Sequence, residues 1–357
     1  MKILVTGALG FIGSNLVPKL LSQGHQVIGI DSLVNPSINP TDRIKASAGS
    51  KWEHFKFFNT DIRATKEIKN LIFYEKAEAL IHLAALGSVQ RSFADPYETT
   101  STNEGGFVAV VKLCSEVGIK RLVFASSSSV YGDHPTAHRR EGYEGQPLSP
   151  YALSKVMNEK FARLFCPMAE INYAGLRFFN VYGPGQRPDS PYSSVIPRFI
   201  NEPKPEVYGD GLQTRDFTYI EDVCDAVIAA LNLTANRDAA ILNVGTGKPT
   251  SLLKLLDLTS GPGNPITKKP DRKGDVKDSF ADTSKAAEIL GWEAKVSVEE
   301  GIKLTKTYYD KLYNRKVKPN GKEAKDKALP AESSQEKKPV KTPKAPEGKK
   351  TTKEAGR

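Results

Sequence analysis

A glycine-rich turn at the amino terminus constrains the fold of this chain more than any other feature of the sequence. The apolar run 2–6 is typical of a short strand, and residues 14–21 place apolar side chains at helical spacing. Between them, Gly7 suits a tight turn, Gly10 lets the backbone approach a pyrophosphate, and Gly13 lets helix and strand pack closely. An ordinary tight turn also uses glycine. A strand, this GxxGxxG turn and a helix in that order nevertheless predict a dinucleotide site at the helix N-terminus.

Acidic residues follow the next two apolar runs. Residues 26–30 are followed by Asp31, whose carboxylate suits the ribose hydroxyls of NAD and repels the additional phosphate of NADP. Asp61, with Ile62, follows a third apolar run and either reaches the adenine or caps the helix expected over residues 64–74. We therefore expect NAD as the cofactor.

A fourth strand-like run, residues 79–85, ends in small side chains. Leu83, Ala84 and Ala85 at its end would admit the cofactor backbone. His82 lies inside the apolar run, so we interpret it as a core histidine and not as a catalyst.

Strand-like and helical segments alternate through about residue 174. This alternation predicts an α/β fold with a doubly wound parallel sheet of the Rossmann type. Turns rich in proline and glycine then multiply, at 183–191, 201–205 and 260–270. They predict a smaller, less regular C-terminal substrate-binding domain that interleaves with the first.

Tyr151 and Lys155 begin the helical segment that follows the fifth apolar run, 120–125, and its serine cluster, 126–129. Residues four apart share a helix face, so both side chains can point into one pocket at the carboxyl end of a parallel strand. A tyrosine with a pKa of about 10 is a poor base, but a lysine ammonium and a cationic nicotinamide would lower that pKa. Tyr151 would then take a proton from a sugar or alcohol hydroxyl, and a serine would hold it. The alternative is a surface pair on a helix.

Together with five further runs, these residues resemble the extended short-chain dehydrogenases/reductases, in particular the NAD-dependent nucleotide-sugar epimerase and dehydratase branch. The resemblance extends from Met1 to about Tyr313. The further runs are 84–92, 103–106, 177–184, 209–217 and 272–275. They follow the family's order, and the resemblance implies a UDP-sugar as substrate.

The resemblance also implies domain boundaries. Residues 1–174 would form the NAD-binding domain, and about 175–182 and 219–247 would return to it. The substrate-binding portion would then comprise 183–218 and 248–314.

Residues that match family motifs acquire implied roles. Ser127 would be the catalytic hydroxyl beside Tyr151 and Lys155, and Asn103 matches the active-site asparagine. The predicted cofactor contacts are Gly7, Gly10, Phe11, Ile12, Gly13, Asp31, Asp61, Ile62, Leu83, Ala84, Ala85, Asn103, Ser126, Tyr151 and Lys155. The predicted substrate contacts are Ser88, Ser127, Ser128, Tyr151, Asn180, Ser194, Val195, Tyr208, Arg215, Arg272 and Ser279.

Within the substrate set, the resemblance places Asn180 at the diphosphate region and Tyr208 beside the uracil. Arg215 and Arg272 would hold the diphosphate, and a planar guanidinium suits phosphate oxygens. Each arginine is otherwise a surface charge.

The serine cluster narrows the reaction. Dehydratases of the branch carry an Asp-Glu pair where this chain has Ser128 and Ser129, and the glutamate typical of UDP-glucuronate decarboxylases is also missing. The remaining chemistry is 4-epimerisation through a 4-keto intermediate, with NAD retained and unchanged overall. We therefore predict an isomerase.

Ser279 narrows the sugar. In relatives restricted to UDP-glucose and UDP-galactose, a tyrosine occupies the matching position, and a small residue leaves room for a 2-acetamido group. The runs 85–89 and 191–197 also resemble UDP-N-acetylglucosamine 4-epimerases. We predict interconversion of UDP-GlcNAc and UDP-GalNAc. The alternatives are a UDP-glucose or UDP-glucuronate 4-epimerase, with no gating role for Ser279.

The three cysteines, Cys114, Cys166 and Cys224, are far apart and lack metal spacing, which predicts reduced, buried thiols and no metal site. The chain begins with a core strand and has no apolar run of about 18 residues, so we expect a cytoplasmic enzyme without a membrane segment. As in relatives, apolar helices around 103–117 and 153–165 predict a homodimer.

Most of the net positive charge lies in residues 315–357, which carry +8 of the net +10. This Lys/Pro-rich tail without aromatic residues is predicted to be disordered. Interspersed acidic residues favour a solvated tail over one that contacts nucleic acid. A different class of protein is a non-catalytic NAD-binding scaffold that contacts nucleic acid through the tail. The intact Ser127, Tyr151 and Lys155 argue against this alternative.

Overall fold

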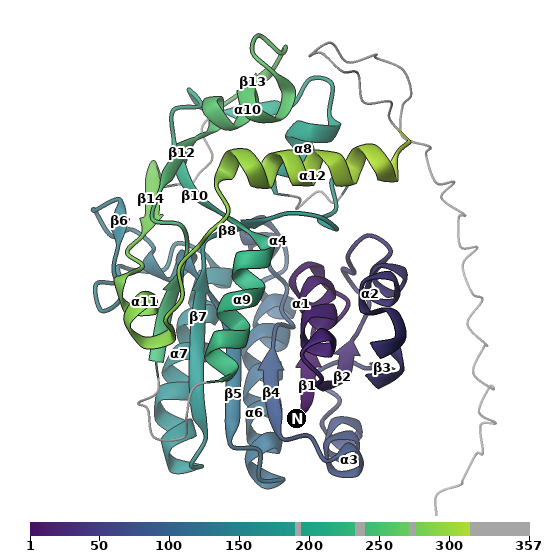
Figure 1. Ribbon diagram of the computed structural model, residues 1–357. Helices are drawn as coiled ribbons and strands as arrows, with labels where there is room; N and C mark the ends of the chain where they lie inside the picture. Colours follow the sequence, from purple (N-terminus) through teal and green to yellow (C-terminus); the bar gives the residue numbers. More distant parts are fainter. Residues whose placement is uncertain (190–193, 233–239, 271–275, 315–357) are drawn as a thin grey trace, which may run out of the picture. The chain divides into compact units, whose positions relative to one another are not determined.

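The computed structural model describes residues 1–189, 194–232, 240–270 and 276–314 (Figure 1). The predicted tail, 315–357, lies outside these residues. No helix within them combines the length and the apolar character that a bilayer span needs.

A seven-stranded sheet organises the described chain, in the order β11-β7-β5-β4-β1-β2-β3. Every neighbouring pair in it is parallel. Its strands are β1 (Lys2–Thr6), β2 (Gln26–Asp31), β3 (Phe55–Asn59), β4 (Ala79–His82), β5 (Arg121–Ser127), β7 (Asn172–Phe178) and β11 (Ala240–Val244). The predicted doubly wound parallel sheet is confirmed. From β1 the strands are added towards one edge of the sheet as far as β3, and from β4 they are added towards the other edge. Open α/β sheets bind ligands at such a switch point, which here lies between β1 and β4.

Helices cover both faces of this sheet (Figure 1). On one face, α1 (Phe11–Ser22) and α9 (Ile220–Leu231) bury Leu16, Leu20, Val223 and Val227 in one apolar cluster. On the other face, a second apolar cluster draws on α3 (Thr65–Glu75), α6 (Gly106–Glu116) and α7 (Pro150–Met168). Two cores on opposite faces explain why the central strands read as continuous apolar runs.

The remaining strands form smaller sheets. β10 pairs with β12, β14 and β8, β14 pairs with β6, and β13 pairs with β9. These strands are β6 (His138–Arg139), β8 (Asn180–Tyr182), β9 (Glu206–Tyr208), β10 (Thr214–Tyr219), β12 (Pro249–Ser251), β13 (Thr267–Lys269) and β14 (Asp278–Ala281). The division into a cofactor-binding and a substrate-binding domain stays a prediction.

Short helices complete the described chain. They are α2 (Pro40–Ala48), α4 (Val89–Ala94), α5 (Pro96–Thr100), α8 (Val195–Asn201), α10 (Leu252–Ser260), α11 (Ser284–Leu290) and α12 (Val298–Leu312), with 3₁₀ turns η1 (Gly49–His54) and η3 (Ser128–Tyr131) and a π-helical turn η2 (Ser101–Gly105). Single π-helical turns occur often at functional sites.

Candidate active site

The glycine turn lies directly between β1 and α1. Gly7 has φ +71°, and a Cβ there would lie 2.8 Å from the backbone nitrogen of Ala84, at the end of β4. A Cβ on Gly13 would lie 2.2 Å from the carbonyl oxygen of Gly7. Both positions therefore require glycine, because any larger residue would push the turn away from β4 or from α1.

The N-terminus of α1 is suited to an anion. Gly10 occupies the N-cap position without a side-chain capping bond, and the first turn, which includes Phe11 and Ile12, contains no acidic residue. The backbone N–H groups and the helix dipole there fit a pyrophosphate, so the residues present fit a dinucleotide.

Asp31 ends β2 beside this turn. Its Oδ2 accepts the Leu9 N–H at 3.0 Å, and its Oδ1 accepts the Leu33 N–H at 2.8 Å. Each carboxylate oxygen keeps capacity for a further bond, which a ribose hydroxyl can donate.

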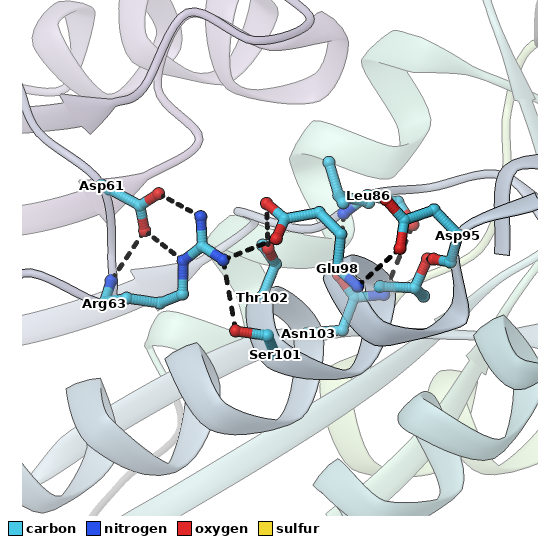
Figure 2. A network of polar contacts seen from close by, with 9 residues as sticks. Asp61, Arg63, Leu86, Asp95, Glu98, Ser101, Thr102 and Asn103 are labelled. Atoms are coloured by element: carbon cyan, nitrogen blue, oxygen red, sulfur yellow. Dashed lines mark hydrogen bonds and ion pairs between the residues drawn. The ribbon is translucent and has the colours of Figure 1, made fainter. Parts of the chain in front are cut away.

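The Asp61 carboxylate forms hydrogen bonds with the Arg63 guanidinium and does not cap a helix (Figure 2). The Arg63 guanidinium donates to Oδ1 at 3.0 Å and to Oδ2 at 2.7 Å, and this contact lowers the pKa of Asp61. The N-cap of α3 is Ala64, without a side-chain bond, so the helix-capping interpretation of Asp61 was wrong. Ile62 is buried, and a Cβ on Gly106 would lie 2.4 Å from it.

Asn103, in η2, joins the segment after β4 to α7. Its Oδ1 accepts the Leu86 N–H at 2.8 Å, and its Nδ2 donates to the Leu86 carbonyl at 3.3 Å (Figure 2). Nδ2 also donates to Ser154 Oγ at 3.1 Å. The side chain is buried. In this geometry Asn103 holds the segment that contains Leu83, Ala84 and Ala85 against the helix that carries Tyr151 and Lys155.

The sequence starts α7 at a defined point. Ser149 caps the helix by accepting the Ala152 N–H, and Pro150 stands at its first position. Tyr151 and Lys155 consequently lie on the first turns of α7, and the Lys155 Nζ is 5.9 Å from the centre of the Tyr151 ring.

Ser127 ends β5 within hydrogen-bonding reach of the Tyr151 phenol. Ser129 Oγ donates to Ser127 Oγ at 2.9 Å, and Lys155 Nζ donates to the Ala125 carbonyl at 2.8 Å. The structure therefore brings the three predicted catalytic residues together. Ser128 lies next to them in η3.

Burial disfavours the charged forms of both Lys155 and Tyr151. It lowers the pKa of Lys155 to about 8, and the nearby Glu159 carboxylate acts in the opposite direction. It also raises the pKa of Tyr151, against a smaller lowering effect of Ser127. The sequence predicted a lowered pKa for Tyr151. In the protein alone, the loss of solvation outweighs the neighbouring hydroxyl, so activation of the phenol needs further positive charge at the site.

A pocket of about 240 Å³ gathers much of the predicted substrate set. Asn180, Ser194, Val195, Tyr208 and Arg215 line it. Sequence reasoning missed the other lining residues, which are Arg198, Phe199, Glu206, Gln213, Phe217 and Leu252.

The missed residues Gln213 and Glu206 position the predicted Tyr208. Gln213 Nε2 donates to the Tyr208 carbonyl at 2.7 Å, and the Tyr208 hydroxyl donates to Glu206 Oε2 at 3.0 Å. Gln213 lies within the run 209–217 that carried the family resemblance, so that run held a signal for it. Glu206 had none.

The other six predicted substrate residues are not among the described residues that line this pocket. Ser127, Ser128 and Tyr151 lie at the end of β5 and the start of α7, as described above, and the remaining three lie elsewhere or cannot be placed. Ser279 is buried on β14, directly opposite Arg215 of β10. Ser88 caps α4 by accepting the Arg91 N–H and does not line the pocket. Arg272 lies outside the described residues.

Within the described residues, no group of three or more His, Cys, Asp or Glu side chains is arranged so that it could bind a metal ion. His82 is buried, with its pKa lowered to about 3 by desolvation, which agrees with its interpretation as a core histidine.

Comparisons with known proteins agree with this geometry. A model of the NAD dependent epimerase/dehydratase family matches residues 3–245. Among curated relatives, a UDP-glucuronate 4-epimerase from Thermodesulfobacterium geofontis is 36% identical over 311 residues, which cover 85% of this chain and 94% of that protein.

Solved structures of UDP-sugar 4-epimerases are also similar to this chain. The UDP-glucose 4-epimerase of Thermotoga maritima has a TM-score of 0.80 at 33% identity, over 88% of this chain and 100% of that one. The UDP-N-acetylglucosamine 4-epimerase of Methanobrevibacter ruminantium has a TM-score of 0.78 at 30% identity, over 87% of this chain and 98% of that one.

Proposed function

The chain belongs to the NAD dependent epimerase/dehydratase family, and we propose that it is a UDP-sugar 4-epimerase that interconverts UDP-GlcNAc and UDP-GalNAc. NAD is its cofactor. The observation that carries the proposal is that Ser127, Tyr151 and Lys155 lie together where β5 ends. The two residues that follow Ser127 are serines and not acidic residues.

The chemistry follows from these three side chains. When bound, NAD supplies a reversible hydride acceptor for the sugar carbon that carries the reacting hydroxyl. Tyr151 takes the proton of the C4 hydroxyl and later returns it. Ser127 hydrogen-bonds the same oxygen, and the Lys155 ammonium favours the phenolate. Serines stand at positions 128 and 129, so the acid pair that dehydratases of the family use to remove water is missing. Hydride returned by bound NAD to the opposite face of the 4-keto sugar would complete an epimerisation.

The pocket supports a nucleoside diphosphate. Tyr208 supplies an aromatic face for the uracil, and Arg215 supplies a guanidinium for the diphosphate. Asn180 lies in the same pocket, where it can contact the substrate's diphosphate region. We include Arg272 in this proposal on the family resemblance.

Ser279 supports the acetamido sugar. Its small side chain is buried on β14 opposite Arg215, at a position where a tyrosine would occupy additional volume. The M. ruminantium relative is named for UDP-N-acetylglucosamine. Other relatives are named for UDP-glucose and UDP-glucuronate, and these sugars are the alternatives that an experiment must separate.

A panel of UDP-sugars tests the proposal. Purified protein without added cofactor should interconvert UDP-GlcNAc and UDP-GalNAc, as followed by chromatography of the products. Ser279→Tyr should remove activity on the acetamido pair and keep activity on UDP-glucose, if the wild type has any. Phe280→Tyr adds a hydroxyl to the adjacent side chain, on the other face of the strand, and serves as the matched control. Turnover of UDP-glucose or UDP-glucuronate alone would refute the acetamido assignment.

A non-catalytic NAD-binding scaffold is the competing class. It predicts protein that carries NAD and changes none of the UDP-sugars. A net yield of NADH would instead indicate a dehydrogenase.

We also propose a homodimer. Leu153, Met157, Leu164 and Met168 are exposed apolar side chains at helical spacing on α7, and Val108 on α6 is exposed as well. An apolar stripe of this kind fits a second copy of the chain. Met157→Glu should convert a dimer into monomers in sedimentation experiments, and a monomeric wild type would refute the proposal. The cytoplasm is the proposed compartment, and the described cysteines, all free and buried, are compatible with it.

A further inference from the structure

A buried ion pair lies beneath the catalytic residues and takes no part in the chemistry described above. Glu159 lies on α7, one turn beyond Lys155, and Arg177 lies on β7. Arg177 Nε donates to Glu159 Oε1 at 2.9 Å, and Nη2 donates to Oε2 at 2.7 Å. The exposed fractions are 5% for Glu159 and 1% for Arg177. Burial of two charges costs solvation that their attraction often fails to recover, so stability alone does not account for this pair.

The carboxylate of this pair touches the active site on two sides. Ser126 Oγ donates to Glu159 Oε1 at 2.5 Å, and Ser126 immediately precedes Ser127 in β5. On the same helix, residues four apart are neighbours, and the charge of Glu159 counteracts the effect of burial on the pKa of Lys155. One carboxylate is thereby coupled to the end of β5 and to the lysine.

Arg177 is itself held in place from three sides. Its guanidinium lies 4.8 Å from the centre of the Tyr131 ring, and the Tyr131 hydroxyl donates to Asn243 Oδ1 at 2.7 Å. Its Nη1 is 2.5 Å from an oxygen of Glu144, which is more exposed and touches neither Ser126 nor Lys155 in the bonds described. The pair therefore cannot rotate away from β5 without breaking several contacts.

We propose that Glu159 is a positioning residue of the catalytic centre, which keeps the Lys155 ammonium charged and holds β5 so that Ser127 meets Tyr151. Arg177 fixes the Glu159 carboxylate in that role. The inference rests on the proposed function for its catalytic meaning, but its electrostatic part concerns the protein alone.

Other groups near Lys155 or Glu159 do not supply this charge. His82, on β4, is neutral because burial lowers its pKa to about 3. Further titratable groups around the two residues include Tyr151, Arg163 and Cys166 on α7, Tyr173 and Arg177 on β7, Tyr131 in η3 and Glu144. Of the neighbours described, Glu159 is the acidic group whose charge acts directly on Lys155.

The test measures the titration of Lys155 in the full-length protein. The ¹³C shift of the lysine ε-carbon, assigned by comparison with Lys155→Arg, follows its protonation independently of activity. Glu159→Gln keeps the shape and removes the charge, so the Lys155 midpoint should fall by about one pH unit or more. The alkaline limb of the kcat–pH profile should move in the same direction. Glu159→Asp keeps the charge and should restore most of the wild-type midpoint.

Glu144→Gln is the matched control, because it removes a carboxylate from the same arginine without touching Ser126. It should leave the Lys155 midpoint and kcat near their wild-type values. An unchanged midpoint in Glu159→Gln, or an equal shift in Glu144→Gln, would overturn the inference.

Ser126→Ala supplies a second test that does not depend on the folding of Glu159→Gln. It removes one donor to the carboxylate and leaves the charge, so kcat should fall, by up to about 10²-fold if Ser127 is displaced by about 1 Å. The Lys155 midpoint should stay in place. An unaltered kcat would refute the positioning of β5. A wild type that epimerises no UDP-sugar would refute the proposed function, while the Lys155 titration would still decide the electrostatic inference.

Discussion

Two corners of the molecule each contain a buried carboxylate, and different kinds of hydrogen-bond donor bind the two carboxylates. In the catalytic corner, formed by β5, β7 and α7, Glu159 binds the side chains of Arg177 and Ser126. A network of side chains transmits charge to Lys155, so this corner controls protonation as well as position.

In the substrate corner, formed by β10, β14 and the turn after β11, Asp216 binds mainly backbone. It accepts the N–H groups of Thr246, Gly247 and Ala281 at 2.8, 2.9 and 3.1 Å, and the Thr246 hydroxyl at 2.7 Å. This carboxylate joins three segments and thereby places its neighbour Arg215 in the pocket.

The difference predicts unequal tolerance to substitution in the two corners. Backbone bonds to Asp216 hold the frame of the pocket whatever side chains line it, so a residue such as Ser279 can change without loss of the frame. The side chains of the catalytic corner depend on one another and leave less freedom for substitution.

Loss of the acid–base group should have the largest effect. Tyr151→Phe removes the hydroxyl that we propose exchanges the proton, so kcat should fall by about 10²–10⁴-fold. The KM for the UDP-sugar should change little, because the pocket residues are untouched. Steady-state kinetics and the amount of bound NAD check this prediction. A large rise in KM with kcat retained would show that the two corners are not separable.

Lys155, in the catalytic corner, should carry a cost in stability that changes at alkaline pH. Its pKa of about 8 lies below the ordinary 10.5, so the folded protein binds fewer protons than the unfolded chain between these values. Unfolding free energy should therefore rise between pH 8 and 10.5, and below pH 8 the buried charge should cost roughly 3 kcal/mol. Lys155→Met should be inactive but more stable at pH 7, with the gain shrinking towards pH 10.5. Urea unfolding at pH 7 and pH 10 measures this, and equal gains at both values would contradict it.

The glycine turn and much of the catalytic corner were predictable because their signals are local. The glycine turn, the strand β5 and the Tyr151–Lys155 pair each lie within a short stretch of sequence, and helix geometry puts the pair on one face. The doubly wound parallel sheet followed from the same alternation of segments, although the alternation did not predict its seven strands.

The supporting contacts were not predictable, because their partners are distant in sequence. Arg177 is 18 residues from Glu159, and Ala281 is 65 residues from Asp216, so no local pattern joins them. Asp61 shows a different limit. Its position suggested either an adenine contact or a helix cap, but Arg63, only two residues away, binds its carboxylate and also donates to the distant Glu98 (Figure 2).

Neutralising the carboxylate of the substrate corner should have an intermediate effect. Asp216→Asn replaces an acceptor by an amide NH₂, which faces N–H donors and leaves one or more of them unpaired. Stability should fall by roughly 2 kcal/mol, and the KM for the UDP-sugar should rise more than kcat falls, because Arg215 is displaced while Tyr151 is not. Urea unfolding and steady-state kinetics measure both. A loss confined to kcat would place Asp216 in the catalytic corner and break the comparison.

The smallest effect should come from the one side-chain hydroxyl that binds Asp216. Thr246→Val keeps the shape and removes the 2.7 Å bond to Oδ1, while the backbone N–H of the same residue still donates to that oxygen at 2.8 Å. Stability should fall by about 1 kcal/mol, and kcat and KM should stay near wild type. Ser126→Ala, the equivalent deletion in the catalytic corner, should lower kcat instead. If Thr246→Val lowered kcat to the same degree, a backbone-supported and a side-chain-supported carboxylate would be equally critical to turnover, and the distinction between the two corners would fail.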